Sequence, residues 1–234
     1  MNKKISECQV LITGGNQGLG KAFKEALEEL GADVYITSRK NAPKSFFWDM
    51  ASDDSTKDLL KTLEEKNVQV DTLIHCAHIF SDKKLIPQVK PLDFKNSLNQ
   101  NIVPIYELSR GLTRGMARRG FGRVLYIGSL ISQYGGAGKV SYITEKAALS
   151  GMVKAFHAEF SSKNVLTNIV HPNLFETPDI HERVPAHIIE EMKKESPTGN
   201  LMSMDEVIKT SLPLLMPEST KSGEVLLIDG GVKW

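Results

Sequence analysis

Short apolar runs alternate with longer segments of helical period along the whole chain, and this alternation restricts the fold more than any other feature. The expected strands are Gln9–Thr13, Asp33–Thr37, Thr72–Ala77, Arg123–Gly128, Leu166–His171 and Glu224–Asp229, with a weaker one at Ser45–Trp48. The expected helices are Leu19–Leu30, Asp54–Lys66, Pro91–Arg119, Ser141–Phe160 and Ser203–Leu215. Runs such as VLYIG and VLLID are almost continuously apolar, which is typical of strands covered on both faces. An α/β fold is therefore predicted, with a doubly wound parallel sheet and helices on both faces.

The chain shows no internal repeat, low-complexity tract or flexible linker, so residues 1–234 are expected to form a single domain. Residues 172–197 differ from the rest because they combine prolines with polar residues and a short helical pattern near Ala186–Lys194. This stretch follows the carboxyl end of a strand, where open α/β sheets bind ligands. A substrate lid is therefore expected at about residues 172–200.

Composition excludes several classes of protein. The formal net charge is +1, so no overall field draws the chain to nucleic acid or to a membrane surface. The N-terminal stretch MNKKISECQVLITGG lacks the apolar core of a signal peptide and a membrane-spanning run. The two cysteines, Cys8 and Cys76, do not make a disulfide framework. A cytoplasmic protein with no nucleic-acid or membrane partner is expected.

Glycines cluster where the first strand is expected to meet the first helix. Gly14, Gly18 and Gly20 lie in LITGGNQGLGKAF, where a tight turn, a close approach to a pyrophosphate and close helix packing each favour glycine. Helix N-terminal amides attract phosphates. The turn is therefore predicted to bind a dinucleotide, and the alternative is a plain tight turn. The cofactor-binding residues expected here are Gly14, Asn16, Gln17, Gly18, Leu19 and Gly20.

The end of the second strand distinguishes the two nicotinamide cofactors. A carboxylate there would favour NAD, whereas arginine accommodates the 2′-phosphate of NADP. The chain reads VYITSRK, with Ser38 and Arg39, so NADP(H) is favoured over NAD(H), although a solvated arginine is the alternative. Asp49 and Met50 follow the weak third strand and are expected to border the adenine, with a solvated loop acid as the other interpretation of Asp49.

Three side chains predict the chemistry. Tyr142 and Lys146 are four residues apart on a predicted helix, so they share one face, and Ser129 follows the strand RVLYIG at its carboxyl end. A phenol with a reference pKa near 10 becomes a better proton donor beside an ammonium group, which lowers that pKa. A hydroxyl donating to a carbonyl oxygen stabilises the charge that develops there. The alternative is a strand-end cap and an exposed helix pair.

Together these motifs resemble the short-chain dehydrogenases/reductases. The resemblance rests on TGGNQGLG from Thr13, on Asn101, on Ser129, on YITEK from Tyr142 and on the ending GEVLLIDGG, and it covers essentially the whole chain. It implies a Rossmann-type domain in which Tyr142 is the acid/base, Lys146 binds the nicotinamide ribose and Ser129 orients the carbonyl. It further implies that Asn101 holds a relay water and that Pro172 and Thr177 contact the cofactor. Asn173 departs from the family, which usually has Pro-Gly there; asparagine tolerates left-handed dihedrals.

The stretch IHCAHI at 74–79 looks at first like a metal site, but strand alternation places His75 and Ala77 on one side and Cys76 and His78 on the other. No metal is expected. By resemblance the stretch stands where the family has Asn-Asn-Ala-Gly, so Cys76, Ala77 and His78 are expected to border the cofactor. His78 puts an imidazole where a glycine leaves room, and it is expected to narrow the channel, to hydrogen-bond the dinucleotide or to displace the backbone.

The pattern is nearest to reductases of 3-oxoacyl chains on acyl-carrier protein. The expected activity is NADPH-dependent reduction of a ketone or carbonyl by hydride transfer, on a small molecule or a carrier-bound thioester. The alternatives are an alcohol or sugar dehydrogenase and a dinucleotide-binding sensor subunit. Basic residues that would attract an acidic carrier are Arg114, Arg118, Arg119 and Lys163; the alternative is a solvated face. Lid residues that would contact an anionic substrate, or nothing, are His181, Arg183 and His187. A homodimer or homotetramer is expected through the helices carrying Asn101 and Tyr142, with an ordinary buried face as the alternative for the stripe Leu149, Val153, Phe156 and Phe160.

Overall fold

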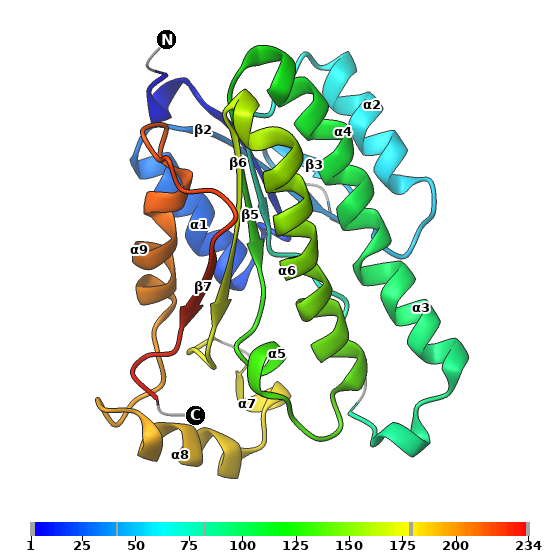
Figure 1. Ribbon diagram of the computed structural model, residues 1–234, viewed down its shortest axis with the longest axis vertical. Helices are drawn as coiled ribbons and strands as arrows, with labels where there is room; N and C mark the ends of the chain where they lie inside the picture. Colours follow the sequence, from blue (N-terminus) through cyan, green and yellow to red (C-terminus); the bar gives the residue numbers. More distant parts are fainter. Residues whose placement is uncertain (1–2, 41, 82, 178–179, 233–234) are drawn as a thin grey trace.

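A seven-stranded parallel sheet forms the centre of the protein and carries helices on both faces (Figure 1). The computed structural model describes residues 3–40, 42–81, 83–177 and 180–232. The strands are β1 Gln9–Thr13, β2 Asp33–Ser38, β3 Ser45–Phe47, β4 Thr72–His75, β5 Gly122–Ile127, β6 Val165–Pro172 and β7 Val225–Ile228. Their order across the sheet is β3-β2-β1-β4-β5-β6-β7. The chain therefore adds strands on one side of β1 up to β3 and then on the other side from β4 to β7, while all strands stay parallel. The predicted doubly wound α/β fold is confirmed.

The helices fall into two layers. Their bounds are α1 Gly18–Glu29, α2 Ser55–Glu65, α3 Pro91–Asn101, α4 Val103–Arg119, α5 Ile131–Tyr134, α6 Val140–Phe160, α7 Ile180–Arg183, α8 Ala186–Glu195 and α9 Met204–Leu215. On one face α1 and α9 bury Phe23, Leu27 and Val207 against the sheet. On the other face α2, α4 and α6 bury side chains such as Leu59 and Leu108 (Figure 1). The strands are apolar on both sides because both faces are covered.

Two predicted elements differ from the structure. The helix expected over Pro91–Arg119 is two helices, because the chain turns at Ile102 with φ −118° and ψ −47°. Pro104 follows two residues later, and a proline lacks the N–H that would continue the first helix and crowds the preceding turn. The strand expected over Thr72–Ala77 ends at His75, so strict side-chain alternation ends there as well.

The apolar stripe on α6 faces the interior. Leu149 and Val153 are buried in the core between α6 and the sheet, Phe160 packs against the same cluster, and Phe156 is buried beside the Tyr106 ring of α4. Leu149 and Val153 therefore belong to an ordinary buried face of the chain. No helix among the described residues combines the length and apolarity needed to cross a membrane.

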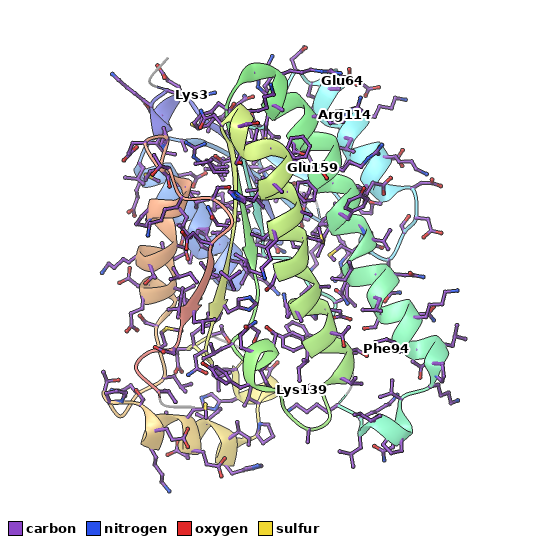
Figure 2. The ribbon with its side chains drawn as sticks, viewed as in Figure 1. Lys3, Glu64, Phe94, Arg114, Lys139 and Glu159 are labelled. Atoms are coloured by element: carbon purple, nitrogen blue, oxygen red, sulfur yellow. The ribbon has the colours of Figure 1, made fainter. Side chains whose placement is uncertain are left out.

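Two of the basic residues expected to attract a carrier protein, Arg114 and Arg119, lie far in space from the start of α6, which carries Tyr142. Arg114 and Arg119 are near the end of α4, and Figure 2 shows Arg114 at the opposite end of the molecule from Lys139, which directly precedes α6. Arg119 is exposed, but its guanidinium is engaged within the chain: its Nη2 donates to Val70 O at 2.6 Å and lies 3.7 Å from Asp71 Oδ1. Within one chain, a carrier docked there would sit roughly 25 Å from the start of α4, the length of a 17-residue helix.

Two helical glycines give a matched test of the packing that positions the first turn. A Cβ on Gly20 in α1 would collide with the carbonyl oxygen of Gly14, whereas a Cβ on Gly151 in α6 would meet nothing within 4 Å. We expect Gly20→Ala to lower the free energy of unfolding by about 1–3 kcal/mol, because the turn must shift. Gly151→Ala should raise it by about 0.5–1 kcal/mol through helix propensity. Urea unfolding of both variants measures this, and equal effects would contradict the packing argument.

Candidate active site

The carboxyl ends of the parallel strands bring the predicted site residues to one edge of the sheet. The turn after β1, the loop after β4, Ser129 after β5 and Pro172 at the end of β6 all lie at this edge. The N-terminal part of α6 joins them, because Lys146 Nζ donates to the carbonyl oxygen of Ile127 at 2.9 Å. Open α/β sheets bind ligands at this edge, where the strand order reverses.

The glycine turn has the geometry that a phosphate site needs. Gly14 and Gly18 adopt left-handed φ values of 66° and 53°, which side chains disfavour. A Cβ on Gly14 would lie 3.0 Å from Ala77 Cα, whereas a Cβ on Gly18 would meet nothing within 4 Å. Helix α1 begins at Gly18, so its first amides lack intrahelical acceptors and face an open approach. Asn16 and Gln17 are exposed beside it, and Leu19 is buried in the core.

Gly15, which the sequence analysis did not single out, has a packing role. A Cβ there would collide with the side chain of Ile36 on β2. This glycine lets the turn lie against β2, and only the register of β1 with β2 makes that visible.

Thr13 ties the glycine turn to the loop after β4. Its Oγ1 accepts hydrogen bonds from the main-chain N–H groups of Cys76 and Ala77, each at 3.1 Å, and lies 2.8 Å from His75 Nδ1. Since two donors occupy its lone pairs, the Thr13 hydroxyl hydrogen is free to donate to His75 Nδ1. The loop 76–78 therefore lies directly beside the glycine turn.

The residues expected to bind the adenosine half lie at the ends of β2 and β3. Ser38 is buried, its Oγ accepts from Lys40 N at 3.0 Å, and Arg39 is exposed. Asp49 Oδ1 accepts from Ala51 N at 3.1 Å, so this carboxylate stabilises its own turn. The Met50 side chain is buried in the core, which leaves only its backbone for a ligand.

Tyr142 and Lys146 lie together as predicted from their spacing. Lys146 Nζ is 5.8 Å from the centre of the Tyr142 ring, and Lys146 is buried. Burial lowers the pKa of Lys146 to about 8, while the carboxylate of Glu145 acts in the opposite direction. An ammonium that remains protonated at neutral pH beside a phenol favours the phenolate, which suits proton donation by Tyr142.

Ser129 is held by a histidine that the sequence analysis did not identify. The main-chain N–H of Ser129 donates to Nδ1 of His171 at 3.0 Å, and His171 Nε2 lies 2.9 Å from Ser150 Oγ. Gly128 is required here, because a Cβ would collide with the His171 ring. His171 thus fixes the strand end that carries Ser129, and its partners are too distant in the chain for the sequence to indicate this role.

Asn101 clamps the loop after β4. Its Oδ1 accepts from Ile79 N at 2.8 Å, and its Nδ2 donates to Ile79 O at 3.0 Å and to Glu145 Oε1 at 3.3 Å. Asn101 is the last residue of α3, where the helix breaks, and it is almost fully buried. Its side-chain donors are therefore committed to the loop and to α6.

His78 turns toward α6 because the strand has ended at His75. Its Nε2 lies 2.8 Å from Glu145 Oε2, and its ring packs edge-on against Tyr142 at 5.1 Å between centroids. Cys76, by contrast, packs on the α1–α9 side, and burial raises its thiol pKa to about 12. Among the described residues no group of three or more His, Cys, Asp or Glu side chains is placed to hold a metal ion.

Beyond β6 the chain covers the same edge of the sheet. Leu130 N donates to Pro172 O at 2.9 Å. Asn173 has no left-handed backbone; its Nδ2 donates to Asp229 O at 3.1 Å and so ties this turn to the end of β7. Thr177 is buried and its carbonyl accepts from Ile180 N at 3.1 Å. The helices α7 and α8 lie below the strand ends, with His181 and His187 exposed (Figure 1).

These features belong to a known family. The short chain dehydrogenase family matches residues 9–187, and the chain belongs to it. Its members are NAD(P)-dependent oxidoreductases acting on CH–OH or C=O groups, so this protein is an enzyme of that class.

The named proteins to which the chain is similar have two different activities. The chain is 28% identical over 235 residues to a 3-oxoacyl-[acyl-carrier-protein] reductase of Vibrio harveyi, covering 95% of this chain and 96% of the relative. It superimposes with a TM-score of 0.87 on a gluconate 5-dehydrogenase of Burkholderia cenocepacia J2315 in complex with NADP and tartrate, at 23% identity and 96% and 94% coverage. A 3-oxoacyl (acyl-carrier-protein) reductase of Agrobacterium tumefaciens C58 with NADP bound gives a TM-score of 0.86 at 22% identity, with 96% and 93% coverage. The two structures support the fold alone.

Buried histidines make the site sensitive to acid. Burial lowers the pKa of His78 to about 4 and also lowers those of His75 and His171. The unfolded chain takes up protons near pH 6.5, before the folded state does, so the free energy of unfolding falls between pH 6.5 and about 4. For His78 alone the loss is at most about 3 kcal/mol.

Urea unfolding at several pH values in this window tests the prediction. His78→Gln should show a shallower dependence on pH, whereas the exposed control His187→Gln should keep the slope of the unmodified protein. An equal slope in all three proteins would contradict the assignment of His78 as a neutral buried imidazole.

Proposed function

We propose that this protein is an NADPH-dependent reductase of a carbonyl substrate with Tyr142 as the proton donor. The observation that carries the proposal is the juxtaposition of a buried Lys146, held at the end of β5, with the Tyr142 phenol on the adjacent turn of α6. Ser129 lies at the same strand end, two residues beyond Ile127. The set matches the needs of a carbonyl whose oxygen must gain a proton as its carbon gains a hydride.

Each side chain has a distinct task in this proposal. NADPH, when bound at this site, would supply the hydride for the carbonyl carbon. Tyr142 donates its phenolic proton to the carbonyl oxygen, and the Lys146 ammonium stabilises the phenolate left behind. Ser129 donates a hydrogen bond to the same oxygen while its charge develops. Lys146 then returns a proton to Tyr142 and regains one from solvent through a relay water. Because the Asn101 side chain is already hydrogen-bonded to Ile79 and Glu145, the main-chain carbonyl of Asn101 is the group proposed to hold that water.

The turn after β1 is the proposed pyrophosphate site. The unfilled space around Gly18 and the amides of α1 fit a diphosphate, and the approach of Ala77 to Gly14 sets the width of the cleft. Residues proposed to contact the cofactor are Gly14, Asn16, Gln17, Gly18, Leu19, Gly20, Ser38, Arg39, Asp49, Met50, Cys76, Ala77, His78, Tyr142, Lys146, Pro172 and Thr177. The exposed Arg39 at the end of β2 supports NADPH over NADH, because a guanidinium pairs with a 2′-phosphate.

A 3-oxoacyl thioester is the first candidate substrate because the Vibrio harveyi relative is a 3-oxoacyl-[acyl-carrier-protein] reductase. A polyhydroxy acid is the second candidate, because the fold is shared with a gluconate 5-dehydrogenase, although that likeness is one of fold. The segment 172–200, which includes α7 and α8, is the proposed substrate lid. A homodimer or homotetramer is the proposed assembly. On α4, Val103 and Tyr106 are exposed, and the Tyr106 ring meets the α6 ring of Phe156, so these residues are the candidate contact in place of the buried Leu149 and Val153.

Replacement of Tyr142 tests the proposed chemistry. We expect Tyr142→Phe to lower kcat roughly 10²- to 10⁴-fold with a 3-oxoacyl thioester or another ketone, while NADPH still binds, because a general acid contributes about that factor. NADPH oxidation followed by absorbance measures kcat, and calorimetry measures binding. An unmodified protein that binds NADPH but reduces no carbonyl in a broad panel would favour a sensor subunit instead.

The pH dependence has an expected direction. Since the pKa of Lys146 is lowered to about 8, kcat/KM for reduction should fall as the pH rises above about 8 and the ammonium is lost. A profile that is flat from pH 7 to pH 9.5 would contradict the role given to Lys146.

Arg39→Ala tests the cofactor preference. We expect NADPH affinity to fall about 10- to 100-fold with little change for NADH, since a charge-assisted hydrogen bond contributes about 1.5–3 kcal/mol. Lys40→Ala, at the neighbouring exposed position, is the matched control and should change the ratio less. Equal NADPH and NADH affinities in the unmodified protein would overturn the assignment.

A further inference from the structure

A buried polar network joins three parts of the site through Glu145. Glu145 lies on α6 between Tyr142 and Lys146 and is 1% exposed. Its Oε2 lies 2.8 Å from His78 Nε2, and its Oε1 accepts from Ser97 Oγ and, at 3.3 Å, from Asn101 Nδ2. The carboxylate thus links α6 to α3 and to the loop after β4.

The hydrogen-bonding groups around Glu145 indicate which nitrogen of His78 carries the proton. His78 is neutral at pH 7 because burial lowers its pKa to about 4, so the contact with Glu145 is a hydrogen bond from a neutral imidazole and not an ion pair. An ionised carboxylate only accepts, so the proton of His78 is on Nε2. Three donors then converge on Glu145, from His78, Ser97 and Asn101, which is the arrangement that stabilises a buried anion.

This anion is placed where the chemistry needs it. The next residue on its helix is the buried Lys146, whose pKa is raised by Glu145 against the larger effect of burial. Four titratable groups on the neighbouring strands also face Lys146, and all four are neutral at pH 7. They are His75, Cys76 and His78 from β4 and its loop, and His171 from β6. Glu145 is therefore the neighbouring group whose negative charge favours the ammonium.

We propose that Glu145 is a positioning residue of the reaction: oriented by His78 and Ser97, it holds Asn101 in place and keeps Lys146 in its charged form beside Tyr142. His78 also fixes the Tyr142 ring, which it meets edge-on. The His78 imidazole and the Glu145 carboxylate form one hydrogen-bonded pair. This inference rests on the proposed function for its consequence in turnover, whereas the effect of Glu145 on Lys146 is measured without any substrate.

The direct test is the titration of Lys146 in the protein without substrate. Lysine labelled with ¹³C at Cε gives one NMR signal per side chain, and Lys146→Met identifies the signal of Lys146. In Glu145→Gln, which keeps the size and one acceptor oxygen, we expect the pKa of Lys146 to fall by about one unit, because an opposite charge nearby shifts a pKa by about that much or more. Glu159→Gln, at an exposed position on the same helix, is the matched control and should leave the Lys146 titration unchanged.

A second variant keeps the test decisive if Glu145→Gln does not fold. Removing the partners of a buried charge together with it costs less than removing the charge alone, so Glu145→Ala combined with His78→Gly and Ser97→Ala should fold and should show the same downward shift. Asn101 Nδ2 keeps its hydrogen bond to Ile79 O in that variant. An unchanged Lys146 titration in either folded variant would overturn the proposal and reduce the network to packing.

Turnover separates this inference from the proposed function. In Glu145→Gln the alkaline limb of kcat/KM should move to lower pH by the same amount as the Lys146 titration, with little change in KM. A lower rate with an unmoved limb would overturn the proposal. If the titration shifts but the unmodified protein reduces no carbonyl, the inference about Lys146 stands and the assignment as a reductase fails.

Discussion

The hydroxyl of Thr13 is the contact on which the rest of the site depends. It accepts two main-chain hydrogen bonds from the loop after β4 and lies against the His75 ring, so it fixes that loop beside the glycine turn. The turn then approaches Ala77 so closely that Gly14 has no room for a side chain. Asn101 secures the far end of the loop at Ile79. The width of the proposed cofactor cleft follows from these few contacts.

Electrostatics supplies the second constraint. Burial lowers the pKa of Lys146 to about 8, and the neighbouring carboxylate of Glu145 acts in the opposite direction. Burial makes each of these groups sensitive to its neighbours, because interactions between charges strengthen when water is excluded. The reactivity proposed for Tyr142 and the acid sensitivity expected of the fold therefore share one cause.

Much of this could be predicted from the sequence. The parallel sheet followed from alternating apolar runs, and the placing of Lys146 beside Tyr142 followed from their spacing on one helix. The break at Ile102 could not be seen from periodicity, since Pro104 lies at the start of a second helix whose apolar pattern continues the first. His78 was placed on the wrong side, because alternation was carried past His75, where the strand ends. Glu145 and His171 were missed, because their importance comes from partners distant in the chain.

The central claim is hydride transfer to a carbonyl with proton donation by Tyr142. The most direct test is a single turnover with NADPH carrying deuterium at C4 of the nicotinamide and a 3-oxoacyl thioester or other ketone, followed by mass spectrometry and NMR of the product. We expect deuterium on the carbinol carbon, and far slower transfer in Tyr142→Phe. Bound NADPH that delivers no label to any carbonyl, or equal transfer in Tyr142→Phe, would contradict it.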